Sequence, residues 1–271
     1  MEFFLAVTDA QARLVASWMN IGFIHGVMNT DNMTISGETI DYGPCAFMNS
    51  YSPGTVFSSI DQHGRYAYAN QPEILVWNLA RLAETLIPIV DPDKNRAIEL
   101  LTETIDCIKP LYESHWLAGM QSKIGLSTED SQDQKLITDL LSLMEEGQAD
   151  FTLVFRHLAK FLRGESDPLR NLFKDPGAID PWLQRWQKRL EQEGVSKDTR
   201  AETMDRFNPI YIPRNHKVEE ALSAAVEQGD MKPFTKMLNV LNHPFDDIQE
   251  EEVYAEPPPM SNIPYRTFCG T

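Results

Sequence analysis

The chain has 271 residues, of which 42% are hydrophobic and 24% are charged, as in an ordinary soluble globular protein. Its formal net charge of -16 argues against a general nucleic-acid binder and against a binder of anionic membranes, because both need a basic surface. The sequence contains no apolar run of about 18 residues, so we expect no transmembrane helix. Its N-terminus also lacks the basic region of a signal peptide.

Apolar residues at helical spacing dominate the pattern from the N-terminus onward. Thr8 or Asp9 is expected to cap a first helix, because both residue types are favoured at N-caps. That helix should end near Gly22 or Gly26, since glycine readily adopts the left-handed conformation that ends many helices.

Helices return after Gln71-Pro72, with boundaries marked by proline, glycine and capping residues. The first begins at residue 71 and should be broken by Pro88 and by Asp91-Pro92. We expect the others at about residues 93–124, with a bend near Pro110, at 131–145, 150–163, 218–229 and 232–241, with further starts at 167 and 180. Residues 246–256 carry six acidic side chains and no basic one, which predicts a solvated, extended or wrapped tail. The sequence shows no glycine-rich phosphate loop.

A short segment after the first helix carries the residues suited to chemistry. Residues 33–35 and 39–40 are β-like runs joined by Ser36-Gly37-Glu38, which predicts a hairpin. Asn32 precedes the first run and Asp41 follows the second, so we expect them side by side at the hairpin base. An amide oxygen and a carboxylate are suitable ligands for Mg²⁺ or Mn²⁺, and such an ion would bridge nucleotide phosphates.

The order of these residues is the layout of the protein-kinase catalytic loop and its Asp-Phe-Gly element, where an Asn and an Asp hold the metals. His25 takes the position of the histidine in the kinase His-Arg-Asp triplet, and Asp41 begins an Asp-Tyr-Gly element. The kinase base would fall on Val27, which cannot accept a proton. Asp31, beside Asn32, is the nearby carboxylate able to act as a base or to orient a nucleophile.

Each of these features is common when taken alone. Asp-Asn and Asp-Tyr-Gly are frequent in turns, and His25 by itself is expected to orient a loop or to fill a core. The combination at kinase spacing is more specific. A phosphotransferase of the aminoglycoside-kinase type is a weaker alternative, because Val27 replaces the aspartate of its His-Gly-Asp start.

Residues 26–33 (Gly-Val-Met-Asn-Thr-Asp-Asn-Met), followed by Asp-Tyr-Gly-Pro at 41–44, resemble the selenoprotein O family of protein adenylyltransferases. The resemblance covers nearly the whole chain. It continues through residues 64–68, 70–72, 77–83, 208–211, 214–215 and 244–246.

The resemblance implies a pseudokinase that binds ATP in an inverted orientation and transfers AMP to hydroxyl side chains of target proteins. It implies that Asp31 is the proton acceptor, that Asn32 and Asp41 bind the metal, and that Asp41 also contacts ATP. The expected partners are therefore protein substrates, with neither nucleic acid nor membrane. The expected location is the cytoplasm in a bacterium or the mitochondrion in a eukaryote.

Cysteine usage agrees with a reducing compartment, because Cys45, Cys107 and Cys269 form neither a disulfide framework nor a metal pair. Members of the family often end in a redox-active cysteine or selenocysteine, and Cys269 matches that position. The family tail can form an intramolecular disulfide, for which Cys45 or Cys107 would be the partner here. Cys269 is thus a candidate redox residue.

The expected fold is mainly α. It comprises a protein-kinase-like C-lobe with a small β-hairpin at the metal site (residues 1–125), a family-specific helical extension (126–243) and an acidic, proline-rich tail (244–271). Family members carry an N-lobe with a glycine-rich loop, a lysine and arginines that bind phosphates, and this sequence contains none of these. An N-lobe on another polypeptide is therefore a possible partner. The alternative is a non-catalytic helical fragment, or half of a split enzyme, that acts as a binding module.

Overall fold

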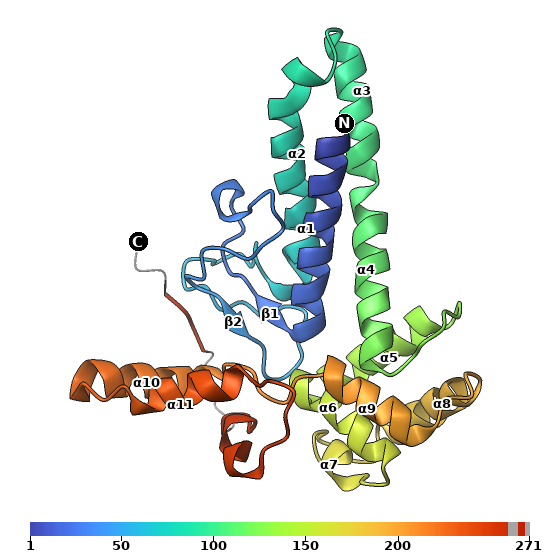
Figure 1. Cartoon of the computed structure of the whole chain (residues 1–271), viewed down its shortest axis with the longest axis vertical. Coiled ribbons are helices and arrows are strands. Elements are labelled where there is room, and N and C mark those ends of the chain that lie inside the picture. The colour runs from blue at the N-terminus through green and yellow to red at the C-terminus, as the bar shows by residue number, and fades with distance from the viewer. Residues whose placement is uncertain (260–264, 269–271) are drawn as a thin grey trace. The chain divides into compact units, whose positions relative to one another are not determined.

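A computed structural model describes residues 1–259 and 265–268 of the chain. The described residues are mainly helical, as predicted, and include one small two-stranded sheet (Figure 1). They form two compact units: unit 1 comprises Met1–Ala46, Pro53–Gly119 and the described residues from Arg266 on, and unit 2 comprises Phe47–Ser52 and the described residues from Met120 to Tyr265. In the described part, no helix is both long and apolar enough to cross a membrane.

Unit 1 is built around three helices, α1 (Glu2–Ile21), α2 (Gln71–Val90) and α3 (Lys94–Asp106), which lie side by side in Figure 1. Helix α1 packs on α2, and α2 packs on α3. Helix α4 (Ile108–Lys123) follows α3. The core of unit 1 consists of fully buried apolar side chains at helical spacing, among them Ala12, Val15, Leu75, Leu79, Ala97 and Leu101. Burial of each large aliphatic side chain contributes about 1.5–3 kcal/mol, which holds the helices together.

Helix α1 begins at Glu2, so the prediction of a cap at Thr8 or Asp9 was wrong. Both residues lie inside the helix because their side chains make tertiary contacts instead. Thr8 is buried, and Asp9 accepts a hydrogen bond from His115 Nε2 at 2.8 Å. The predicted end at Gly22 is confirmed, since Gly22 adopts the left-handed conformation with φ 72°.

Two prolines behave differently from their predictions. Helix α2 runs through Pro88 to Val90, so the predicted break at Pro88 was wrong, whereas the predicted break at Asp91-Pro92 is confirmed. Pro88 lies in the last turn, where little of the helix remains to be disrupted. The predicted helical region at 93–124 is two helices separated at Cys107, and Pro110 occupies the first turn of α4, where proline is tolerated.

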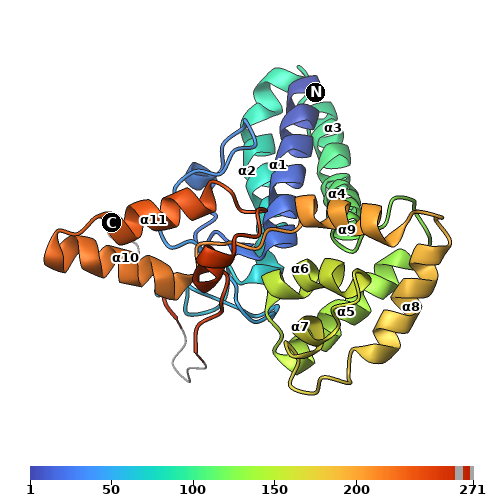
Figure 2. The same cartoon turned by 60° about the horizontal axis from the view of Figure 1, so that its bottom comes forward.

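Unit 2 contains a cluster of helices around α6 (Figure 2). Helix α6 contacts α7 and α9, and α5 contacts α8. Most of α6 is buried, with Asp150 capping it by accepting from the backbone N–H of Leu153 at 2.9 Å. The predicted start of α6 and those at Asp167 and Asp180 are confirmed. The bounds of these helices are α5 (Asp133–Gly147), α6 (Phe151–Leu162), α7 (Asp167–Arg170), α8 (Asp180–Glu191) and α9 (Lys197–Phe207).

Helix α9 was not predicted from the sequence. Its residues are mostly polar, and a search for apolar periodicity does not detect such a segment. Ser196 caps it by accepting from the backbone N–H of Thr199 at 3.2 Å. Arg200 anchors it from within the core, donating to the carbonyl of Leu190 at 3.2 Å and to Glu193 at 2.8 Å.

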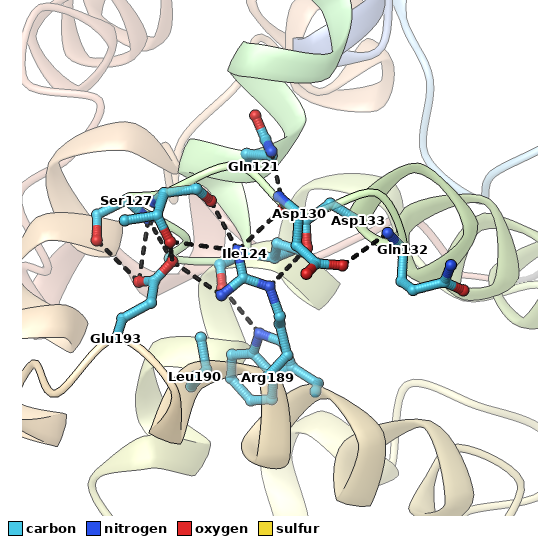
Figure 3. Close-up of polar contacts among 12 residues, drawn as sticks. Gln121, Ile124, Ser127, Asp130, Gln132, Asp133, Arg189, Leu190 and Glu193 are labelled. Atoms are coloured by element: carbon cyan, nitrogen blue, oxygen red, sulfur yellow. Dashed lines mark hydrogen bonds and ion pairs between the residues drawn. The ribbon is translucent and has the colours of Figure 1, made fainter.

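An ion network is buried in unit 2 (Figure 3). Arg189 donates to both carboxylate oxygens of Asp133, at 2.7 and 3.1 Å. The carboxylate of Glu193 accepts from Arg189, from Arg200 and from the backbone N–H groups of residues 127–128. Burial alone would raise the pKa of Glu193, but the hydrogen bonds to its carboxylate, that of Arg200 first, hold this pKa well below its usual range.

Two further helices of unit 2, α10 (Asn215–Gln228) and α11 (Lys232–Leu241), form an antiparallel pair (Figures 1 and 2). Gly229 ends α10 in the left-handed conformation, with φ 65°, as predicted. The acidic tail contains a 3-10 helix, η3 (Gln249–Tyr254), and the Ala255 that follows is buried against Tyr211.

Candidate metal and nucleotide site

The candidate site is the loop between α1 and α2. At the base of this loop, β1 (Phe23–Ile24) pairs with β2 (Ala46–Phe47) in an antiparallel sheet. Gly26 follows β1 with φ +85°, and a Cβ placed there would lie 2.8 Å from the carbonyl oxygen of Pro44. This close approach requires glycine at position 26.

His25 is buried at the centre of this loop. Its Nε2 lies 2.9 Å from the carbonyl oxygen of Ile40, and a carbonyl only accepts, so Nε2 carries the proton. The imidazole packs against Trp18, with ring centroids 5.3 Å apart. Burial lowers the pKa of His25, against the opposing effects of the Ile40 hydrogen bond and the Asp41 charge. His25 therefore fixes the residue before Asp41 and is placed to orient the loop.

The predicted hairpin is present in a reduced form. Met33 and Thr39 make a single antiparallel bridge, whereas residues 33–35 and 39–40 form no strand pair in the described structure. The expectation of two β-strands there was wrong, although the turn that joins the two arms is present.

Helix α1 explains why the ladder is short. Trp18 Nε1 donates to the hydroxyl of Thr39 at 2.8 Å, and the amide of Gln11 donates to the carbonyl of Thr34. The backbone N–H of Gly37 also donates to the carbonyl of Thr34, at 3.2 Å. These contacts tie the turn to α1 and use backbone groups that a longer ladder would pair.

Asn32 ends a 3-10 turn, η1 (Thr30–Asn32). Its Nδ2 donates to the carbonyl of Val27 at 3.0 Å, and its backbone N–H donates to the carbonyl of Asn29 at 3.0 Å. Because the amide nitrogen is held by Val27, the amide oxygen is left as the free acceptor. Position 27 contributes its backbone here, so a valine serves this role as well as an aspartate.

Asp31 and Asp41 are both exposed, and neither side chain has a hydrogen-bond or ion-pair partner in the described part of the chain. Asp41 has φ 52°, in the left-handed region that non-glycine residues seldom occupy. Such backbone strain costs on the order of 1–3 kcal/mol and is concentrated at functional sites. The His25 contact with Ile40 and the Met33–Thr39 bridge hold Asp41 in this conformation.

The donor set fits a hard divalent cation. The amide oxygen of Asn32 and the carboxylate of Asp41 are oxygen donors of the kind that Mg²⁺ takes alongside nucleotide phosphates and water. Within the described residues, no group of three or more His, Cys, Asp and Glu side chains is arranged to hold a metal. A cation at Asn32 and Asp41 would thus need oxygens from the nucleotide to complete its coordination.

Three residues that position the loop were not identified as functional from the sequence. Gln71 accepts from the backbone N–H of His25 at 3.0 Å, and Asn78 donates to the carbonyl of Met28 at 2.9 Å. The hydroxyl of Tyr66 donates to the side-chain oxygen of Asn29 at 2.7 Å. All three lie within the sequence motifs that resemble the family, and this resemblance was the only feature of the sequence that could have identified them.

A cavity of about 320 Å³ borders the loop in unit 1. Thr30 and Met33 contribute from the loop, and Arg81 and Asn78 contribute from α2. Its lining is mainly apolar and also includes Val7, Leu75, Leu79 and Leu82. An apolar side chain of a ligand would fit such a cavity.

The two described cysteines are free thiols. Cys45 is half-buried and donates to the carbonyl of Tyr42 at 3.4 Å, and burial raises the pKa of its thiol. Cys107 is exposed between α3 and α4. Cys269 lies outside the described residues, so its redox role remains a prediction.

The structure is that of a mainly helical protein whose α1–α2 loop carries the exposed carboxylates of Asp31 and Asp41. The family model described as "Protein adenylyltransferase SelO" matches residues 1–242, and the chain belongs to this family.

Curated relatives agree with this assignment. The chain is 54% identical over 272 residues to "Protein nucleotidyltransferase YdiU" of Cereibacter sphaeroides, covering 100% of this chain and 55% of the relative. It is 52% identical to the protein of the same name from Maridesulfovibrio salexigens, covering 98% and 54%, and 51% identical to that from Rhizobium meliloti, covering 98% and 55%. The chain thus spans about half the length of the curated relatives it matches.

Proposed function

We propose that this chain forms part of a metal-dependent protein adenylyltransferase that transfers AMP from ATP to Ser, Thr or Tyr hydroxyls of target proteins. The observation that carries the proposal is the amide of Asn32, whose nitrogen is held by Val27 and whose oxygen is free, on the same loop as the exposed, unpaired carboxylates of Asp31 and Asp41. Membership of the SelO family supports the nucleotidyl-transfer chemistry.

Asp31 is the proton acceptor in this proposal. The acceptor hydroxyl gives its proton to Asp31 while its oxygen forms a bond to the α-phosphorus of ATP. The bond from that phosphorus to the oxygen bridging to the β-phosphorus breaks, and pyrophosphate leaves with the electron pair. Asn32 and Asp41 would hold a Mg²⁺ or Mn²⁺ ion, which would supply positive charge to stabilise the phosphates.

His25 and its neighbours position these groups. His25 and Gln71 fix the loop backbone, and Asn78 holds the carbonyl of Met28. The proposed fold of the loop and α2 is that of a kinase-like C-lobe, with a pseudokinase assignment because Val27 stands at the usual base position.

The remaining phosphate-binding groups are proposed to lie in the half of the relatives' length that this chain does not span. We use "complete enzyme" below for a form that contains both halves. Glycine-rich and cationic groups on that other half would neutralise the phosphates, since positioning and charge stabilisation supply most of the catalysis in phosphoryl-type transfer.

Position-labelled ATP tests the proposal. The complete enzyme is incubated with a protein substrate, Mn²⁺ or Mg²⁺, and ATP labelled at the α-phosphate or, separately, at the γ-phosphate. The proposal predicts protein-bound label from the α position, and label from the γ position would contradict it. For the alternative of a non-catalytic binding module, calorimetric titration of this chain with ATP and Mg²⁺ is decisive, because tight binding would count against it.

A further inference from the structure

One exposed cluster in unit 1 lies next to the catalytic loop and is not used in the chemistry above. Arg65 and Arg81 both place their guanidinium groups over the indole of Trp77, at 5.0 and 5.5 Å from the ring centroid. Trp77 remains 41% exposed. We call these three residues the Arg–Trp–Arg cluster.

The charge of this cluster is available to a ligand. Arg65 has no carboxylate partner among the described residues, in a chain with a net charge of -16. Arg81 pairs with Glu84 at 2.8 Å, but both side chains are about half exposed. An exposed pair of this kind contributes about 0–1 kcal/mol, so an incoming carboxylate can replace Glu84.

The loop that carries Arg65 is already ordered. The carboxylate of Asp61 accepts from the backbone N–H groups of Arg65 and Tyr66, at 2.9 and 2.8 Å. Asn70 donates to the carbonyl of Gly64 at 2.7 Å, and Gly64 has φ +67°. These bonds hold the loop backbone, so a ligand would find Arg65 in place without paying for loop ordering.

The cluster is connected to the catalytic loop at both ends. On one side, Tyr66, next to Arg65, donates to Asn29, two residues before Asp31. On the other side, Arg81 lines the cavity of about 320 Å³ that Thr30 also lines. A polypeptide whose hydroxyl reaches Asp31 would pass over one or both of these elements.

We infer that the Arg–Trp–Arg cluster docks the segment of the protein substrate that flanks the acceptor hydroxyl, selecting acidic side chains beside an apolar one. The carboxylates contact the two guanidiniums, and the apolar side chain enters the cavity. Charge complementarity with the two arginines, one of them unpaired, and the apolar lining of the cavity carry this inference. It rests on the proposed function for the identity of the partner.

Peptide binding by the 271-residue chain tests docking without any catalysis. The probe is a fluorescein-labelled peptide with one serine, one leucine and several glutamates, compared by anisotropy with a version that has lysine for glutamate. The acidic peptide is expected to bind about tenfold more tightly or better at low salt, and the difference should shrink at high salt. Equal binding of the two peptides would overturn the inference.

Charge reversal gives a gain-of-function check. The double variant Arg65→Glu/Arg81→Glu should prefer the lysine peptide. The matched variant Arg13→Glu/Arg96→Glu, at exposed arginines that do not line the cavity, should keep the wild-type preference. An unchanged preference in the first variant, or an equal change in both, would contradict docking at this cluster.

One further variant separates this inference from the proposed function. Asp41→Asn should leave acidic-peptide binding within about twofold of wild type while abolishing AMP transfer by the complete enzyme. If the complete enzyme transfers no AMP but the charge preference and its reversal are observed, the proposed function fails and the docking surface stands. If transfer is observed and the substrate preference is unaffected by Arg65→Glu/Arg81→Glu, the docking surface fails alone.

Discussion

The imidazole of His25 donates from Nε2 to the carbonyl oxygen of Ile40, 2.9 Å away, and so fixes the residue that precedes Asp41. Asp41 itself sits in the left-handed region of backbone space, with an unpaired and exposed carboxylate. A buried histidine thus binds the backbone carbonyl immediately before an exposed aspartate.

Replacing His25 with Phe keeps the packing against Trp18 but removes the donor to Ile40. Loss of a residue that orients a metal ligand typically costs about 10–100-fold in metal affinity or activity, and we expect a loss in that range. The measurement is AMP transfer by the complete enzyme as a function of Mn²⁺ concentration. His243→Phe, at an exposed histidine, is the control. Wild-type Mn²⁺ dependence in His25→Phe would refute the positioning role.

Asp41→Asn separates charge from backbone shape. Asparagine tolerates the left-handed conformation, so the loop should keep its structure while the carboxylate is lost. Activity of the complete enzyme is expected to fall by about two orders of magnitude or more, because the variant would remove the proposed metal ligand and the proposed nucleotide contact together. Asp106→Asn, on the exposed end of α3, should be neutral. Normal turnover by Asp41→Asn would show that this residue is not a metal ligand.

The Glu193 network predicts a large stability effect far from the loop. Glu193→Ala leaves the buried Arg200 without a carboxylate partner, while Arg189 keeps Asp133. Breaking a buried pair costs about 3–5 kcal/mol. Chemical denaturation should show this loss, whereas Glu191→Ala, at an exposed neighbour, should change stability little. The folded-state pKa of Glu193 is depressed, so the contribution is present above about pH 4.5 and is lost as pH falls below that value. A Glu193→Ala protein as stable as wild type would contradict this role.

Replacing Lys123 is predicted to have the opposite effect on stability. It is buried over the rings of Phe151 and Phe155, at 5.6 and 4.3 Å, and burial lowers its pKa from 10.5 to about 7. Between those values the unfolded chain binds more protons than the folded one, so stability due to this group rises with pH from about 7 to 10.5. Lys123→Met should therefore stabilise the protein by a few kcal/mol at pH 7 and remove that slope.

Thermal or denaturant unfolding of both proteins across this pH range measures the Lys123 effect. Subtracting the variant from wild type removes other titrating groups, including Tyr51, whose pKa burial raises to about 12. A variant that is less stable than wild type at pH 7, or an unchanged slope, would contradict the assignment.

Much of the helical fold could be predicted from the sequence because apolar periodicity and caps report it directly. Asp150, Gly22 and Gly229 end or begin helices as their residue types suggest. Helix α9 was not predicted because its buried anchor is an arginine, Arg200, and a search for apolar periodicity does not count arginine. The start of α1 was predicted at the wrong residue because Asp9 accepts a hydrogen bond from His115 and does not cap a helix terminus.

The candidate site was predicted as a set of ligand types but not as a geometry. The spacing of the sequence identified Asn32 and Asp41 as candidates. The hairpin predicted between them is a single bridge in the structure, because Trp18 and Gln11 of α1 bind the turn. Such contacts join residues far apart in sequence, and local patterns carry no trace of them.

The most direct test of the central claim is the mass of the modified hydroxyl. A protein substrate is incubated with the complete enzyme, ATP and Mn²⁺, and the modified Ser, Thr or Tyr is identified by mass spectrometry alongside an Asp41→Asn blank. We predict a mass gain equal to one AMP moiety, with stoichiometric release of pyrophosphate, and no gain in the blank. A mass gain equal to one phosphate, or an equal AMP gain in the blank, would contradict the account.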